Sequence, residues 1–190
     1  MRAPIRFAVL ALVLISSRSN AADLLSSCVG RFCMFKPLTE KQFVALYGEG
    51  VLRPDAHDQE LRSRCFYDDT SKQWAEFEFS RHSERGPRHL EGVALGQTEL
   101  CSSHYRSRRP MNLRIAKGAV TIGMNEKDVI EKLGRPSKVV TLKPNAPNDI
   151  YDSQWGTHAW IYDSSESELL FRAIYVKDGK MVNYRIFHSE

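Results

Sequence analysis

Four cysteines carry the most predictable chemistry in this 190-residue chain: Cys28, Cys33, Cys65 and Cys101. In a chain that folds outside the cytoplasm, an even number of cysteines predicts disulfides, and four cysteines allow three pairings. We favour Cys28–Cys33, which are close in sequence, and Cys65–Cys101, which flank a predicted antiparallel strand pair. A zinc site is not expected, because Cys-x4-Cys followed by single cysteines matches no common zinc-ligand spacing.

The N-terminal segment predicts export. Two arginines precede an apolar run at 7–15, and the small residues Ala21 and Ala22 follow. This is the layout of a signal peptide over residues 1–22, cleaved after Ala21 or Ala22. The run is too short for a transmembrane helix, which needs about 20 residues. We therefore expect a periplasmic or secreted protein, soluble after cleavage.

A lipoprotein is the alternative for the N-terminus. Residues 25–28, Leu-Ser-Ser-Cys, resemble a lipobox, in which Cys28 would carry the lipid. A lipobox normally follows the apolar run directly, whereas Arg18, Asn20 and Asp23 intervene here. Lipidation of Cys28 would also leave three cysteines, one of them unpaired. We therefore favour the soluble form.

Charge and motifs argue against several functional classes. The chain has 27 basic and 23 acidic residues, and loss of the three leader arginines leaves 24 against 23, a net charge of +1. Such a balance gives no general case for nucleic-acid binding. The sequence has no Gly-x-Ser-x-Gly elbow, no His-Glu-x-x-His pair and no glycine-rich phosphate loop. We predict a protein without enzymatic activity, cofactor or metal.

An arginine-rich segment near the middle of the chain is the strongest candidate for partner binding. Residues 104–110 read His-Tyr-Arg-Ser-Arg-Arg-Pro, and Arg114 follows. Arginines beside a tyrosine can hold carboxylates or phosphates, as on an acidic protein or an anionic lipid head group; a solvated linker is the alternative. Two aromatic residues of a later polar loop are typical of interface anchors. The candidate partner contacts are Tyr105, Arg106, Arg108, Arg109, Tyr151 and Trp155.

Matching cap signals predict two short helices. Thr39 caps the first helix, Gln42 completes a capping box, and Gly48 ends it. Asn125 caps the second helix, which ends at Gly134. Both pairs of cap residues are 86 positions apart, which favours a duplicated unit over chance similarity.

Strands are predicted after each helix. Aromatic and β-branched residues dominate these segments, and Asp178-Gly179 is a strong hairpin signal because both residue types tolerate positive φ. The predicted strands cover 66–68, 72–81 and 89–95 after the first helix, and 161–163, 168–177 and 180–188 after the second.

The second copy resembles a known family. The segments 122–129, 133–136, 160–162 and 178–182 resemble the SmpA/OmlA (BamE) domain, in which a Gly-Met-capped short helix ends in Leu-Gly-x-Pro and a sheet follows. The match covers roughly residues 115–188. Two such units in tandem also resemble the β-lactamase inhibitor protein. The first copy departs from the pattern, because it has Lys-Pro-Leu in place of Gly-Met before its helix.

These observations predict an α+β fold of two tandem units, each with short helices packed on an antiparallel β-sheet. The predicted organisation is a signal peptide at 1–22, a divergent disulfide-containing unit at 23–103, a basic linker at 104–114 and a BamE-like unit at 115–190. The resemblance implies non-catalytic protein binding in outer-membrane or envelope assembly. The alternative is a periplasmic inhibitor or immunity protein that blocks a hydrolase through a concave sheet. The expected partner is outer-membrane assembly machinery or a secreted enzyme, with possible peripheral contact to anionic lipid.

Overall fold

A computed structural model describes most of the chain after residue 26. The described residues are 27–34, 36–54, 61–81, 83, 86–97, 101, 105–143, 155–162 and 170–188. The predicted signal peptide, its cleavage residues Ala21 and Ala22, and Tyr151 lie outside these ranges.

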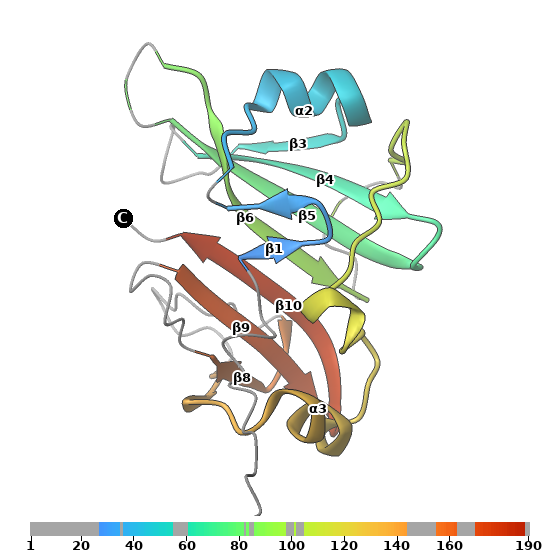
Figure 1. Cartoon of the computed structure of the whole chain (residues 1–190), viewed down its shortest axis with the longest axis vertical. Helices are drawn as coiled ribbons and strands as arrows, with labels where there is room; N and C mark the ends of the chain where they lie inside the picture. Colours follow the sequence, from blue (N-terminus) through green and yellow to red (C-terminus); the bar gives the residue numbers. More distant parts are fainter. Residues whose placement is uncertain are drawn as a thin grey trace, which may run out of the picture.

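One antiparallel sheet of eight strands organises the described residues (Figure 1). Within each half of the chain, neighbouring strands along the sequence pair as a meander. The two halves meet at the middle of the sheet, where Tyr184 lies opposite Leu95 and Ile186 opposite Val93. In sheet order the strands are β3 (Val51–Pro54), β4 (Arg62–Asp68), β5 (Gln73–Ser80), β6 (His89–Gly96), β10 (Lys180–His188), β9 (Leu170–Lys177), β8 (His158–Ile161) and β7 (Lys138–Thr141).

The predicted fold class, an α+β protein of two tandem helix-plus-sheet units, is wrong. The described structure is mainly β, with ten strands and two α-helices of eight residues each. The physical reason lies at the junction of β6 with β10. Two separate four-stranded sheets would each leave these apolar strands at an open edge, and their pairing satisfies the backbone groups of both.

The two helices begin and end where their cap signals predict. Helix α2 (Glu40–Tyr47) has a complete capping box between Thr39 and Gln42, and the Gly48 amide closes its end. Helix α3 (Glu126–Leu133) follows Asn125, but the Asn125 side chain makes no cap hydrogen bond. The Glu126 amide instead donates to the Gly179 carbonyl at 2.9 Å, so the β9–β10 turn caps this helix.

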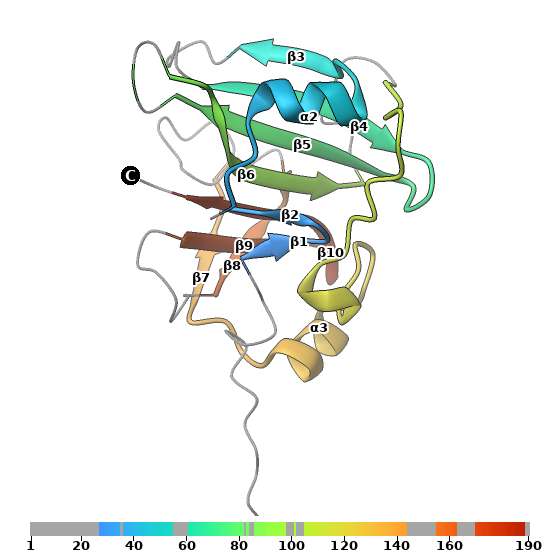
Figure 2. The same ribbon diagram turned by 45° about the horizontal axis from the view of Figure 1, so that its top comes forward.

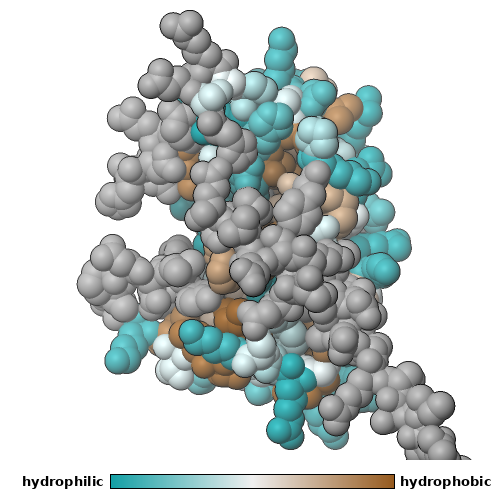
Figure 3. Space-filling view, turned by 60° about the vertical axis from the view of Figure 1, so that its left-hand side comes forward, coloured by the Kyte–Doolittle hydropathy of each residue, from teal (hydrophilic) through white to brown (hydrophobic). Residues whose placement is uncertain are grey.

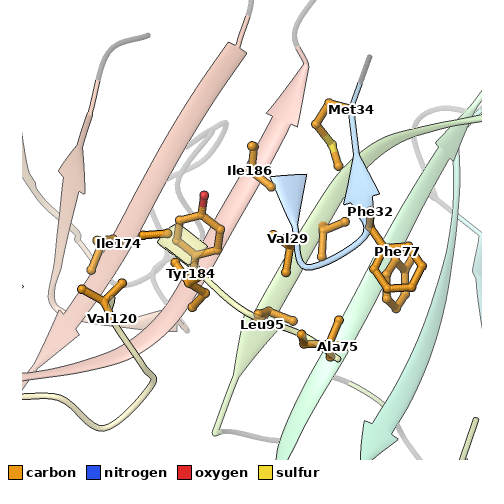
Figure 4. Packing of buried hydrophobic residues seen from close by; sticks show 14 of the residues in the cluster. Val29, Phe32, Met34, Ala75, Phe77, Leu95, Val120, Ile174, Tyr184 and Ile186 are labelled. Carbon is orange, nitrogen blue, oxygen red and sulfur yellow. The ribbon is translucent and has the colours of Figure 1, made fainter. Parts of the chain in front are cut away.

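A small hairpin covers the middle of the sheet, on the same side as both helices (Figure 2). Its strands are β1 (Cys28–Val29) and β2 (Phe32–Cys33), and a disulfide joins Cys28 to Cys33. Val29 and Phe32 are buried between Ile186 of β10 and Phe77 of β5 (Figure 4). The hairpin therefore joins the two halves of the sheet into one apolar core.

The second disulfide lies on the opposite face of the sheet. Cys65 of β4 bonds to Cys101, and both residues belong to a second buried cluster with Trp74, Trp155 and Tyr175. Both bonds have the pairing favoured from sequence. Because structural disulfides persist in oxidising compartments, the protein belongs outside the cytoplasm, as a secreted or periplasmic protein. No helix among the described residues has the length and hydrophobicity needed to span a membrane.

Four of the five longer strands were well predicted, and the other strands were not. Strands β5, β6, β9 and β10 match the predicted segments to within two residues at each end, and the β9–β10 turn is formed by Asp178 and Gly179 at φ 52° and 70°. The prediction missed the edge strands β3 and β7, which have four residues each. It covered only the last three residues of β4 and the last residue of β8. The hairpin of β1 and β2 was also missed.

Candidate functional site

The predicted basic linker is a fixed part of the structure over its described residues, 105–114. The Tyr67 amide donates to the Tyr105 carbonyl at 2.9 Å, and the Arg108 amide donates to the Tyr47 carbonyl at 2.9 Å. Met111 is fully buried in the main core, and Leu113 is nearly so. The segment therefore presents its side chains from an ordered backbone.

Four arginines of this segment are exposed, and three of them, Arg106, Arg108 and Arg109, are close together in sequence. Arg106 forms an ion pair with Asp69 at 2.8 Å, with its side chain 74% exposed. Arg108 and Arg109 are exposed and make no side-chain ion pair or hydrogen bond with another described residue. Tyr105 is half-buried, with its ring edge-on to Phe66 at a centroid distance of 5.7 Å. Tyr105 thus anchors the segment, and the arginines remain accessible to a partner. We call Arg106, Arg108 and Arg109 the arginine ridge.

Trp155 is not the exposed interface anchor that its polar neighbours in sequence suggested. It is 7% exposed and packs edge-on against Tyr175 at 5.2 Å. The Arg185 guanidinium lies 5.4 Å from its ring centroid. Polar flanking residues do not reveal that this tryptophan reaches the second buried cluster, which is assembled from strands distant in sequence.

A pocket of about 240 Å³ lies at the C-terminal end of the arginine-rich segment. It is enclosed by the start of β5, the end of β6 and the segment around the 3₁₀ turn η1 (Ala116–Gly118), and we call it the β5–η1 pocket. Its apolar lining residues are Leu113, Ile115, Val120 and Ile122. Its principal polar lining residues are Lys72, Gln73, Gln97, Arg114 and Thr121. An anionic or hydrogen-bonding group with an apolar portion fits such a lining.

Unusual backbone geometry surrounds this pocket. Lys72, Asn112, Ala116 and Lys117 all have φ between 48° and 57°, a left-handed conformation that is uncommon for residues other than glycine. Gly30, at the tip of the β1–β2 hairpin, packs so closely on this wall that a Cβ atom there would lie 2.1 Å from the Asn112 carbonyl oxygen. The hairpin therefore supports the wall, and the strained residues point to a constrained site.

The opposite face of the sheet contains two buried carboxylates, those of Glu76 and Glu78. Glu76 accepts hydrogen bonds from the Ser63 hydroxyl and from Arg53 Nη1, the latter at 3.1 Å. Burial raises the pKa of the Glu76 carboxyl, although Ser63 and Arg53 oppose this shift. Glu78 accepts two hydrogen bonds from Arg185 Nη2, at 2.8 and 3.1 Å.

We interpret these carboxylates as structural. Each one is bound by an arginine, and their side chains are only 8% and 12% exposed. Gly92 contributes to this packing, because a Cβ atom there would lie 2.5 Å from Glu78 Oε2. Proton transfer to a substrate needs a carboxyl within hydrogen-bond reach of that substrate. Among the described residues, the chemistry of this face therefore indicates buried ion pairing.

An apolar groove lies between α3 and the β7 edge of the sheet. Ile130, Val139 and Trp160 line it, and Val139 is 53% exposed. Seen from the side that carries the C-terminus, hydrophobic surface appears in the lower half of the molecule among hydrophilic side chains (Figure 3). Nothing in the described residues indicates what would cover the groove. The same ranges contain no cluster of three or more potential metal ligands.

Sequence reasoning identified the arginine ridge but missed the polar residues of the β5–η1 pocket. A signal existed at Gln73, which has the strand parity of Ala75 and Phe77 and therefore points to the helix-covered face. A glutamine at a core-facing position is unusual. Gln97, by contrast, follows the end of β6 and gave no comparable signal.

Comparisons with known proteins give no functional assignment. No known protein family matches the chain, and no curated protein is similar to it. Among solved structures, a DUF4309 family protein (YjgB) from Bacillus subtilis is 16% identical, with coverage of 83% of this chain and 82% of that one and a TM-score of 0.45. An extracellular protein containing a SCP domain from Bacillus anthracis is 14% identical, with coverage of 80% of this chain and 43% of that one and a TM-score of 0.47. Neither description names a BamE domain.

Proposed function

We propose that this protein is an exported, non-catalytic protein-binding factor in bacterial envelope assembly or maintenance, and that its arginine ridge contacts an acidic surface of its partner. The envelope role rests on the BamE-like sequence pattern of residues 115–188. The binding role rests on one observation. The exposed arginines of the ridge belong to a segment whose backbone is held by hydrogen bonds and by the buried side chain of Met111.

The fixed backbone favours binding by lowering its entropic cost. A solvated linker would have to be ordered when a partner binds. Here, backbone hydrogen bonds at Tyr105 and Arg108 already hold the segment against the sheet and α2. Arginine suits this role because its planar guanidinium holds carboxylates bidentately. The Arg106–Asp69 pair is exposed and contributes little stability, so a partner carboxylate can compete with Asp69 for Arg106.

The proposal includes a soluble periplasmic form released by cleavage after Ala21 or Ala22. Pairing of Cys28 with Cys33 supports it, because the sulfur that a lipid would modify is already bonded. Intact mass of the protein from its native host checks this: cleavage near Ala22 with four thiols appearing only on reduction supports the soluble form. A mass starting at a diacylated Cys28 contradicts it.

Charge reversal of the ridge tests the binding proposal. The test variant is R106E/R108E/R109E, and the matched control is K127E/K132E/K138E, which makes the same charge change on and beside α3. Each protein captures partners from envelope extracts, and the affinity for the captured partner is then measured at two salt concentrations. We expect at least about tenfold weaker binding, or about 1.4 kcal/mol, for the ridge variant only, and weaker wild-type binding at high salt.

Three outcomes would contradict the proposal. Equal losses in both triple variants would show that net charge matters but the ridge does not. Unchanged binding in the ridge variant would place the interface elsewhere. Capture of a single secreted hydrolase in a one-to-one complex that blocks its activity would replace the envelope role by the inhibitor role.

A further inference from the structure

We propose that the β5–η1 pocket binds a carboxylate carried on a short apolar chain. This inference does not depend on the proposed protein-binding function. It rests on a largely buried glutamine in the pocket lining, on the charge at the pocket mouth, on the apolar floor and on the strained wall.

The largely buried glutamine is Gln73. The residue is 6% exposed, points to the helix-covered face and lines the pocket. Its side chain makes no hydrogen bond with any other described residue. Because Gln73 lines the pocket, its amide can donate a hydrogen bond to a ligand there. Gln97 also lines the pocket; it is exposed, and its side chain makes no hydrogen bond with another described residue.

Positive charge lies at the pocket mouth. The Arg114 side chain is exposed and makes no ion pair or hydrogen bond among the described residues, and Lys72 has only a 3.8 Å contact with Asp69. Arginine and amide groups together supply N–H donors suited to a carboxylate. These groups therefore favour an anionic head group over a neutral one.

The floor and the volume restrict the rest of the ligand. Leu113, Ile115, Val120 and Ile122 form an apolar lining, so the carboxylate should be attached to an apolar chain. The volume of about 240 Å³ lies below the roughly 300–1,000 Å³ typical of drug-sized sites. A short branched acid fits these limits, whether as a free small molecule or as the C-terminal residue of a protein.

The pocket wall around η1 contains residues in unfavourable backbone conformations, as binding sites often do. Ala116 and Lys117 have consecutive left-handed conformations, which are unfavourable for residues other than glycine. Gly123 has φ 90°, and a Cβ atom there would lie 2.9 Å from Gln97 Nε2. Glycine at this position therefore leaves room for the Gln97 amide beside the pocket.

The experiment is an NMR titration of the folded, oxidised protein with 4-methylpentanoate, using its neutral isostere 4-methylpentanamide for comparison. We expect the acid to shift the Gln73 and Gln97 side-chain amide signals, with a Kd of about 1 mM, and the amide to bind at least about tenfold more weakly. R114A and Q73M should each lose at least about fivefold in affinity for the acid. The matched control R135A removes an exposed arginine outside this pocket and should bind like wild type.

Several results would overturn the inference. They are equal binding of the acid and the amide, unchanged binding in both R114A and Q73M, and an absence of shifts at about 20 mM acid. The wild-type comparison of acid with amide keeps the test decisive even where a variant fails to fold.

A second titration distinguishes the two sources of the carboxylate. A peptide ending in leucine that binds more tightly than 4-methylpentanoate assigns the site to a protein C-terminus, and weaker peptide binding assigns it to free small acids. Both results support the ligand chemistry. Retained acid binding in R106E/R108E/R109E would separate this site from the arginine ridge, so either proposal can fail alone.

Discussion

The two faces of the central sheet use opposite chemistry on the same strand. On β5, Phe77 points to the helix-covered face and is fully buried among aromatic rings, including Phe32 and Phe43 at centroid distances of 4.7 Å. Its neighbours Glu76 and Glu78 point to the other face and are nearly as well buried, each bound by an arginine. The helix-covered face thus obtains stability from apolar burial, whereas the other face depends on partners for each buried charge.

The largest effect is expected at the aromatic side of this comparison. Phe77→Ala should lower the free energy of unfolding by about 4 kcal/mol, because it removes a large buried side chain and leaves a cavity between the hairpin, α2 and the sheet. Urea denaturation of the oxidised protein measures the change. A loss below about 1 kcal/mol would mean that the rings can repack around the cavity and that this core is not tightly packed.

A somewhat smaller loss is expected on the opposite face. Glu78→Ala leaves the largely buried guanidinium of Arg185 without its carboxylate and should cost about 3 kcal/mol. The control is the double variant E78L/R185M, which removes both charges together. That variant should lie within about 1 kcal/mol of wild type or exceed its stability. Equal losses in the two variants would show that packing, rather than pairing, determines the cost.

The smallest effect is expected at Glu76 and depends on pH. Burial raises the pKa of this carboxyl above its ordinary value of 4.5, so the folded state binds a proton more tightly than the unfolded state does. The resulting stabilisation is complete below pH 4.5 and is lost as the pH rises through the folded-state pKa. Glu76→Gln mimics the protonated form and removes this dependence.

Denaturation at pH 4 to 8 measures the Glu76 effect. Wild type and E76Q should have similar stability at the acidic end, and wild type should become the less stable of the two as the pH rises. At pH 7 we expect the two to differ by no more than about 1 kcal/mol, because Arg53 and Ser63 partly compensate the ionised carboxylate. A relative gain by wild type at higher pH would contradict the sign of the pKa shift.

Local signals in the sequence determined much of the secondary structure. Thr39, Gln42 and Gly48 set the bounds of α2 through hydrogen bonds between residues three or four positions apart. Asp178 and Gly179 set the β9–β10 turn because both adopt positive φ. Four of the longer strands were also evident, because aromatic and β-branched residues dominate their segments. The disulfide pairing was favoured correctly from spacing and predicted strand order.

Tertiary structure decided the features that depend on contacts between distant segments. The pairing of β6 with β10 merged two expected sheets into one. The sequence of neither strand indicates which other strand it pairs with. Burial of Trp155 and the capping of α3 by Gly179 likewise depend on strands far away in the sequence. The arginine ridge was visible in the sequence because charge is a local property. The β5–η1 pocket was not, because Gln73, Gln97 and Arg114 meet only when the folded sheet brings three separate segments together.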